Sequence, residues 1–159
     1  MYLKEATSAD RIDLEILSLM QKNARISNVA IARALNMAPS AVLERVKKLE
    51  QKNIILQYTT RLNPAALNQN LVAFINIQVI NGIGNSNTAQ ELAKIAEVQE
   101  VHLTAGDDCF LVKIRTTDSA SLLELLRNSI SKIPNIISTK TTLVLETTKE
   151  QQQLVIPKE

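Results

Sequence analysis

A cluster of basic side chains in the N-terminal third of the chain has the chemistry to bind a polyanion. Arg45, Lys47 and Lys48 lie close together in the segment NMAPSAVLERVKKLE, residues 36–50. Residues 1–60 carry nine Lys or Arg against six Asp or Glu, a net +3, whereas residues 61–159 carry nine against ten, a net −1. A Lys/Arg pair on one helix is more often only a solvated surface, so the elements around it decide between the two interpretations.

The spacing of apolar residues predicts that these basic residues share the outer face of a helix that begins at Pro39. The buried stripe of that helix would be Val42, Val46 and Leu49. Arg45 and Lys48 then face outward beside the small residue Ala41, which allows close approach to a DNA major groove, where Arg can pair with guanine or phosphate. Glu44 opposes phosphate binding unless it pairs with Lys47, Lys48 or a cytosine amino group. The predicted DNA-contacting residues are Ser27, Pro39, Ser40, Ala41, Glu44, Arg45, Lys47 and Lys48.

Two shorter helices are expected before this one. The first would run from about Ser8 to Gln21, with Ser8 or Asp10 as its N-cap, and the second follows Ser27, which can cap NVAIARALN. Only residues 36–38 separate the second helix from the third, which is the length of a helix-turn-helix connection. The three-helix pattern, the short turn and the charge asymmetry together favour DNA binding over a solvated surface.

The rest of the chain is expected to form an α+β domain after a β-prone linker or wing. The predicted strands span residues 71–80, 100–105, 109–116 and 136–147, and the predicted helices span 88–98 and 118–133, the second capped by Asp118. The order βαββαβ is typical of the ferredoxin-like sandwich, in which two helices cover one face of four antiparallel strands. A second copy of the chain could cover the other face. The predicted division is 1–53, helix-turn-helix domain; 54–68, linker or wing; and 69–159, βαββαβ domain.

Several other classes of site or protein are not expected. One cysteine, Cys109, and one histidine, His102, rule out an intrachain disulfide and a Cys/His zinc cluster, so no metal is predicted. The chain lacks a Gly-rich phosphate loop and a nucleophile elbow, so we do not expect an enzyme. No signal peptide and no apolar run long enough to span a membrane is found, which favours the cytoplasm. The C-terminal KEQQQLVIPKE is compatible with an arm that reaches a neighbour and with a frayed tail.

Four motifs follow one another along the chain. They are D-x-x-D-x-x-I-L at Asp10 to Leu17, R-I-S-N-V at Arg25 to Val29, R-V-K-K-L-E at Arg45 to Glu50, and Gly106 with Asp107. Their ordered combination resembles the Lrp/AsnC (feast/famine) family of transcriptional regulators. The resemblance implies a winged helix-turn-helix domain and a C-terminal domain that binds a small effector, often an amino acid. It also implies homodimers that assemble into tetramers, octamers or larger rings. An amino-acid-binding regulatory subunit of a metabolic enzyme, without DNA binding, is the alternative, but it leaves the first domain unexplained.

The resemblance places the effector pocket at the turn after the second strand of the C-terminal domain. Where the family often shows Gly-Asp-x-Asp-Tyr, this chain reads GDDCF from Gly106. The hypothesis is that Gly106 admits the ligand and that Asp107 or Asp108 receives its α-ammonium group. A tight turn without any ligand is the alternative, since turns favour Gly and Asp. The predicted effector-binding residues are Thr104, Gly106, Asp107, Asp108, Cys109 and Thr142.

Two further positions depart from the family pattern. Ala38 precedes the proline of the third helix where relatives commonly have Ser, so a side-chain N-cap is absent there. Glu44 stands where a basic residue is frequent, which leaves the operator sequence open.

Overall fold

The computed structural model describes residues 9–80, 86–106 and 109–157. They form two compact units, one of the residues up to Arg61 together with those from Glu150 onward, and the other Leu62–Lys149. The predicted boundaries instead join residues 150–159 to the C-terminal domain. The alternative N-cap Ser8, the predicted loop residues 81–85 and the acids Asp107 and Asp108 lie outside the described residues.

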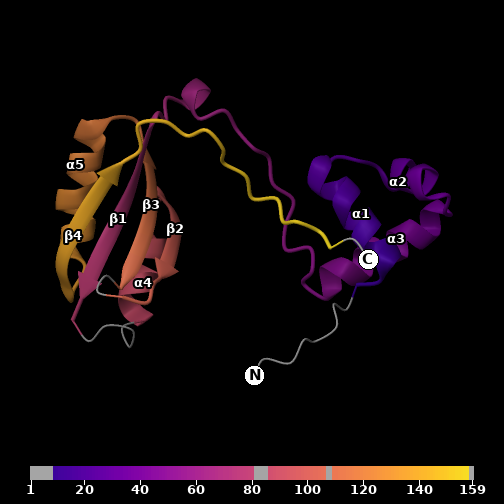
Figure 1. The fold of residues 1–159 in the computed structure, drawn as a ribbon, viewed down its shortest axis with the longest axis horizontal. Coiled ribbons are helices and arrows are strands. Elements are labelled where there is room, and N and C mark those ends of the chain that lie inside the picture. The colour runs from indigo at the N-terminus through magenta and orange to yellow at the C-terminus, as the bar shows by residue number, and fades with distance from the viewer. Residues whose placement is uncertain (1–8, 81–85, 107–108, 158–159) are drawn as a thin grey trace. The chain divides into compact units, whose positions relative to one another are not determined.

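Three helices build the first unit (Figure 1), and they are α1 (Arg11–Lys22), α2 (Asn28–Leu35) and α3 (Pro39–Gln51). Their apolar faces meet in one core, whose buried members are Ile16, Ile31, Ala32, Val42, Val46 and Leu49. The predicted stripe of α3 is therefore confirmed. Each of these short helices would be only marginally stable in isolation. Burial of their aliphatic side chains against one another stabilises all three.

Local capping explains where these helices begin. The Asp10 side chain caps α1, and the Oγ atom of Ser27 caps α2 by accepting a hydrogen bond from the backbone N–H of Ala30 at 3.1 Å. Helix α3 starts at Pro39 without a side-chain cap, because Ala38 has no polar side chain. Asn36 ends α2 in the left-handed region, at φ 52°, a conformation that asparagine tolerates well. These caps allow the short turn that was predicted between α2 and α3.

The β-prone segment 54–62 forms no strand within the part of the chain that the structure describes. The expected β character of the linker is thus not realised, because a strand requires a hydrogen-bonded neighbour and this segment pairs with none of the four strands. The start of the segment is hydrogen-bonded to the end of α3 through the backbone N–H groups of Ile54 and Ile55, which both donate to the carbonyl oxygen of Leu49. The hydroxyl of Tyr58 donates a hydrogen bond to Oε1 of Glu50 at 2.7 Å. A short 3-10 helix, η1 (Ala65–Leu67), follows.

The second unit confirms the predicted βαββαβ order. Its elements are β1 (Leu71–Val79), α4 (Ser86–Ala93), β2 (Val98–Leu103), β3 (Phe110–Thr116), α5 (Ser119–Asn128), the 3-10 helix η3 (Ile130–Lys132) and β4 (Ile136–Leu143). The strands form one antiparallel sheet in the order β2-β3-β1-β4. Asp118 caps α5, as predicted. The helices end earlier than predicted, and the expected helix 118–133 breaks into α5 and η3.

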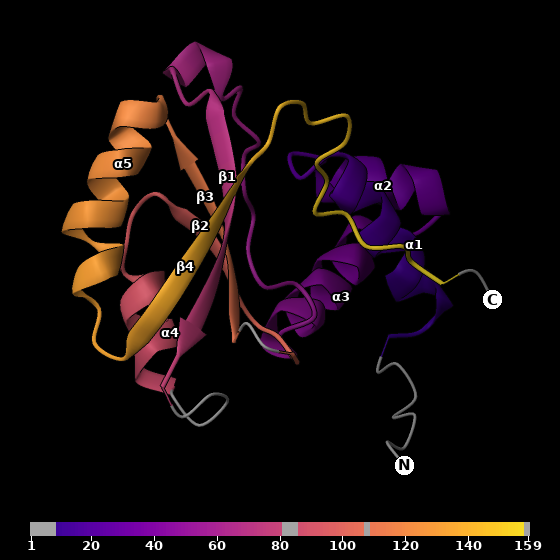
Figure 2. The ribbon, with the colours of Figure 1, turned by 60° about the vertical axis from the view of Figure 1, so that its left-hand side comes forward.

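The sheet has one covered face and one open face. Helices α4 and α5 lie on the same side of it (Figure 2), where Leu92, Leu122 and Leu125 join the inward side chains of β1 and β3 in one core. The open face carries Phe74, opposite Lys113 of β3 and Thr142 of β4. Charged groups also lie on this face. Nζ of Lys113 donates to Glu100 at 3.1 Å, so this face carries an ion pair beside Phe74.

The C-terminal segment belongs to the first unit. The side-chain amide of Gln21, near the end of α1, donates to the carbonyl oxygen of Leu154 at 3.1 Å. The backbone N–H of Leu154 donates back to Oε1 of Gln21 at 2.8 Å. The described part of the tail is therefore hydrogen-bonded to a helix of its own chain rather than frayed.

Candidate nucleic-acid interface

The exposed face of α3 carries most of the predicted DNA-contacting residues. Those that the structure leaves exposed on α3 are Pro39, Ser40, Ala41, Glu44, Lys47 and Lys48. The opposite side of the helix is buried in the core of the first unit. This separation places small and basic side chains on a surface that has the width of a single helix, as entry into a major groove requires.

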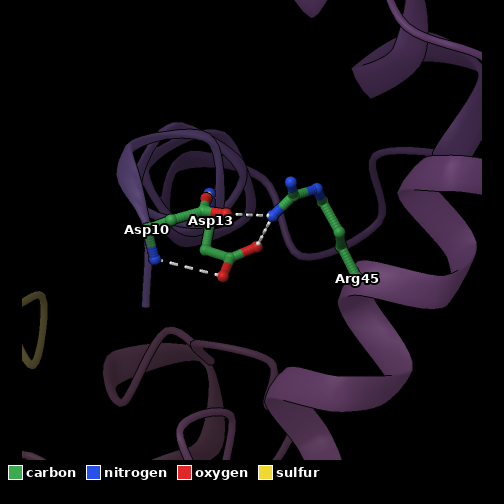
Figure 3. Close-up of polar contacts among 3 residues, drawn as sticks. All are labelled: Asp10, Asp13 and Arg45. Carbon is green, nitrogen blue, oxygen red and sulfur yellow. Dashed lines mark hydrogen bonds and ion pairs between the residues drawn. The ribbon is translucent and has the colours of Figure 1, made fainter. Parts of the chain in front are cut away.

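Arg45 differs from its neighbours on α3. Its side chain is only 29% exposed, and its Nη1 atom lies 2.6 Å from Oδ2 of Asp10 and 2.8 Å from Oδ1 of Asp13. Figure 3 shows both carboxylates reaching from the start of α1 toward the same guanidinium nitrogen. The prediction that Arg45 lies nearest the bases stays a prediction, but the guanidinium is already paired in the unbound chain.

The two carboxylates also cap α1. Oδ1 of Asp10 accepts from the backbone N–H of Asp13 at 2.9 Å, and Oδ2 of Asp13 accepts from the backbone N–H of Asp10 at 3.2 Å. Each carboxylate thus uses one oxygen for the helix and the other for Arg45, and we call these three residues the Asp10–Asp13–Arg45 cluster. The hydrogen bond from Asp13, followed by that from Arg45, holds the pKa of Asp10 below its usual value, and the two acids raise the pKa of Arg45.

Sequence reasoning missed the partners of Arg45. The spacing of Asp10 and Asp13 indicates a capping pair at a helix start, but it does not point to Arg45. The two acids lie 35 and 32 residues before Arg45, so only the packing of α1 against α3 brings them together. The cluster lines an open surface depression of about 440 Å³ together with residues of α3 and its end, which are Ala41, Glu44, Lys48, Leu49 and Lys52.

The remaining polar groups at this surface are weakly constrained. Glu44 pairs with Lys47 at 3.2 Å, one of the partners that the sequence suggested for it, and both side chains are more than half exposed. Such an exposed pair contributes at most about 1 kcal/mol and is easily exchanged for phosphate. Ser27 lies exposed at the start of α2. Its hydroxyl accepts the capping hydrogen bond and still has a proton to donate to a phosphate oxygen.

The predicted effector turn joins β2 and β3 as a hairpin. The backbone N–H of Thr104 donates to the carbonyl oxygen of Cys109 at 2.9 Å, and that of Cys109 donates to Ile77 on β1 at 3.0 Å. Cys109 is buried, and Thr104 is half-buried. Gly106 has φ +138°, and a Cβ atom there would meet nothing within 4 Å. Backbone conformation, rather than crowding, therefore requires glycine at this position.

Thr142 does not join this turn within one chain. It lies exposed on β4 opposite Phe74 of β1, whereas the turn is hydrogen-bonded to Ile77. Three residues along β1 separate these positions by about 10 Å. Strands β4 and β3 also lie on opposite sides of β1. A single chain therefore does not bring Thr142 directly against the turn.

Two family profiles match the chain. Residues 10–55 match the profile described as winged helix-turn-helix DNA-binding, and residues 72–154 match the Lrp/AsnC ligand binding domain. The chain is 38% identical over 151 residues to the leucine-responsive regulatory protein of Escherichia coli strain K12. The match covers 92% of this chain and 91% of that protein. The chain belongs to the Lrp/AsnC family.

Solved structures of related regulators resemble this chain. Escherichia coli AsnC is 26% identical, with a TM-score of 0.85 over 98% of this chain and 100% of that one. A transcriptional regulator from Neisseria meningitidis in complex with L-methionine is 26% identical, with a TM-score of 0.86 over 93% and 97%. A feast or famine regulatory protein from Mycobacterium tuberculosis complexed with L-methionine is 27% identical, with a TM-score of 0.85 over 93% and 99%.

The family membership decides the class of function. This Lrp/AsnC chain is a DNA-binding transcriptional regulator with a small-molecule ligand-binding domain, and its family is one of regulators rather than of enzymes. Nothing in these similarities supports the alternative of a metabolic regulatory subunit without DNA binding. Within residues 9–80, 86–106 and 109–157, no helix is long and apolar enough to cross a membrane.

Proposed function

We propose that the chain reads double-stranded DNA with the exposed face of α3 and changes its DNA binding or assembly when an amino acid binds to the second unit. The observation that carries the DNA-binding part is the division of α3 into a buried apolar stripe and an exposed face of small and basic side chains. Ser40 and Ala41, in the first turn of α3, lie nearest the bases. Lys47 and Lys48 pair with phosphates, and Ser27 with Pro39 approaches the backbone of the duplex.

An amino acid is the proposed effector, in keeping with the L-methionine present in two related structures. Gly106 and the two acids Asp107 and Asp108 would receive it, with the acid that faces the pocket pairing with the α-ammonium group. Thr104 and Cys109 hold the ends of this turn through their backbone hydrogen bond. Thr142 would take part only from a second chain, because one chain keeps it away from the turn.

The proposed assembly is a homodimer that associates further to tetramers, octamers or larger rings in the cytoplasm. The open face of the sheet is the surface proposed to pair two copies, because helices cover only its other face. In this proposed dimer, Thr142 of one chain and the turn of the other share a ligand.

Selection of binding sites from random duplex DNA, followed by gel-shift titration, tests the DNA-binding part. We expect an enriched sequence that binds at least 1,000-fold more tightly than random duplex, which is a common specificity ratio for such regulators. Binding should weaken steeply between 50 and 200 mM salt, by about 10³ or more for six or more phosphate contacts. Absence of any enriched sequence would contradict the proposed reading of bases by α3.

Isothermal titration with the common amino acids tests the effector. We expect heat from one or a few amino acids and none after Asp107 and Asp108 are both replaced by Asn, because the α-ammonium group loses its counter-charge. Glu124→Gln removes a carboxylate from α5, away from the turn, and serves as the matched control. Light scattering with and without the active amino acid then reports whether assembly changes. Unchanged binding heats in the double Asn variant would contradict the proposed site and show that the ligand binds elsewhere.

A further inference from the structure

We infer that Arg45 positions the recognition helix on α1 instead of contacting DNA, and that Asp10 and Asp13 act with it as part of the DNA-reading apparatus. This inference rests on the proposed function, because it concerns how α3 is presented to an operator. It reverses the role that the outward spacing of Arg45 on α3 suggests.

The charge balance of the cluster argues against a phosphate contact. One guanidinium faces two carboxylates, both on the same Nη1 atom, at 2.6 and 2.8 Å. The cluster therefore has a net charge of −1 when all three groups are ionised. A phosphate that approaches Arg45 meets this excess negative charge at short range, so Arg45 adds little of the attraction that a free cation would supply.

Asp10 and Asp13 are joined to each other by contacts that do not involve Arg45. Asp10 and Asp13 hold each other through reciprocal hydrogen bonds to their backbone N–H groups at the start of α1. If Arg45 left for DNA, two neighbouring carboxylates would lose their shared counter-ion, which is unfavourable for like charges at close range. Lys47, by contrast, pairs with the exposed Glu44 at 3.2 Å. DNA can therefore recruit Lys47 at much lower cost than Arg45.

The place of Arg45 along α3 makes it suited to set the rotation of that helix. It lies near the middle of α3, and Ala41 and Lys48 lie four residues before and three after it on the same side. A contact from this position to the start of α1 fixes which way both neighbours point. The buried stripe also fixes α3, but apolar contacts are less directional than hydrogen-bonded ion pairs. The cluster thus supplies orientation that the core alone does not.

The effect of Asp13→Asn on operator affinity distinguishes a DNA-contacting Arg45 from one that positions α3. If Arg45 contacts DNA, Asp13 competes with the DNA for it, and Asp13→Asn should tighten operator binding. If Arg45 positions α3, Asp13→Asn loosens the helix and should weaken operator binding, although a negative charge near the DNA has been removed. A purely electrostatic effect of that charge would also tighten binding, so weakening identifies positioning.

The experiment uses the full-length protein with an operator selected from random DNA and a random duplex of equal length. We expect Asp13→Asn to lower operator affinity roughly three- to tenfold, with little loss on random duplex. Arg45→Lys keeps a cation beside the acids and should stay within about threefold of the wild type. Glu15→Gln is the matched control, because it removes one carboxylate of α1 whose ion pair, among the described residues, is with the exposed Arg11. It should leave the ratio of operator to random affinity unchanged.

Three results would overturn the inference. One is tighter operator binding by Asp13→Asn with a salt slope that rises by about one unit, because that shows Arg45 reaching phosphate. Another is an Arg45→Lys variant that relaxes the preference at a single base pair, because that shows base reading. The third is equal weakening by Glu15→Gln and Asp13→Asn. A wild-type protein that selects no operator would instead overturn the proposed function, and the inference with it.

Discussion

Gln21 and Leu154 are joined by two hydrogen bonds that run in opposite directions between a side-chain amide and a backbone amide. Nε2 of Gln21 lies 3.1 Å from the carbonyl oxygen of Leu154, and the backbone nitrogen of Leu154 lies 2.8 Å from Oε1 of Gln21. Nε2 of Gln153 adds a third bond, to the carbonyl oxygen of Gln21 at 2.9 Å. These residues are more than 130 positions apart in the chain, so the end of the chain is attached to the end of α1 by specific contacts.

Removal of the Gln21 side chain should release the tail. We expect Gln21→Ala to speed hydrogen exchange at the Leu154 amide, because its acceptor is lost, and to lower the local opening free energy by about 1–2 kcal/mol for two neutral hydrogen bonds. Exchange measured by NMR at single residues reports this. Gln152→Ala is the control, since the described residues give its side chain no hydrogen-bond partner. Unchanged exchange at Leu154 in Gln21→Ala would show that the hydrogen bonds between Gln21 and Leu154 are not maintained in solution.

Loss of Arg45 should destabilise the first unit more than loss of an exposed arginine. We expect Arg45→Ala to lower the free energy of unfolding by an amount between the ~1 kcal/mol of an exposed ion pair and the ~3 kcal/mol of a buried one, because its side chain is mostly covered. Arg11→Ala, whose guanidinium is 80% exposed beside Glu15, should change it by less than about 0.5 kcal/mol. Urea unfolding followed by circular dichroism measures both. Equal losses would indicate that the Asp10–Asp13–Arg45 cluster is not formed.

Acid should weaken the cluster in a predictable direction. The pKa of Asp10 is lowered by the Asp13 backbone hydrogen bond and then by Arg45. A carboxyl with a lowered folded pKa contributes stability above its unfolded pKa of about 3.9, and loses that contribution as the pH falls through the folded value. We therefore expect the stability gap between wild type and Asp10→Asn to be constant above about pH 5 and to shrink below about pH 4. Asn can still cap α1, so a gap that is independent of pH would contradict the charge-based cause.

Tyr58 should ionise at a higher pH than an ordinary tyrosine. Partial desolvation of its phenol, which stays half-exposed, together with the hydrogen bond to Glu50, raises its pKa to about 12. A raised folded pKa means that the contribution to stability is complete below the ordinary phenol value of about 10 and is lost as the pH rises toward 12. Absorbance at 295 nm measures the formation of tyrosinate. Tyr58→Phe should remove the rise in this absorbance near pH 12. Glu50→Gln should move that rise to lower pH. An ionisation step near pH 12 that survives in Tyr58→Phe would contradict this assignment.

Charge changes on the outer face of α3 should alter the salt dependence of DNA binding. Lys48→Ala is expected to reduce the slope of log affinity against log salt by about one unit, because one phosphate contact is lost. Glu44→Gln should leave Lys47 without its carboxylate and raise affinity for random duplex. Lys132→Ala, in the second unit, should leave the slope unchanged. An unaltered slope in Lys48→Ala would place this residue outside the DNA contact.

Features governed by neighbouring residues could be predicted from the sequence. Ser27 and Asp118 cap the helices that were expected from them, since capping depends on residues two or three positions away. Pro39 begins α3 because its fixed φ suits a first turn. The βαββαβ order also emerged, because apolar periodicity and turn residues specify each element separately and few topologies accommodate that order.

Features that depend on distant residues could not be predicted. Nothing near Arg45 in the sequence indicates that α1 will present two carboxylates to it, and nothing near Leu154 points to Gln21. The segment 54–62 has the composition of a strand, yet strand formation depends on a partner elsewhere, and the described chain offers none. Thr142 was grouped with the effector turn through the family resemblance, and only the strand register reveals how far along the sheet it lies.

The division of the first unit into two stretches of chain affects how hybrid regulators should be built. The chain leaves this unit after Arg61 and returns to it at Glu150, so the ligand-binding domain is connected as an insertion with two junctions. A chimera that exchanges everything beyond residue 61 would replace the tail that Gln21 holds with a foreign one. Grafting another relative's ligand-binding domain between residues 61 and 150 would keep the native tail, and with it the native end of α1.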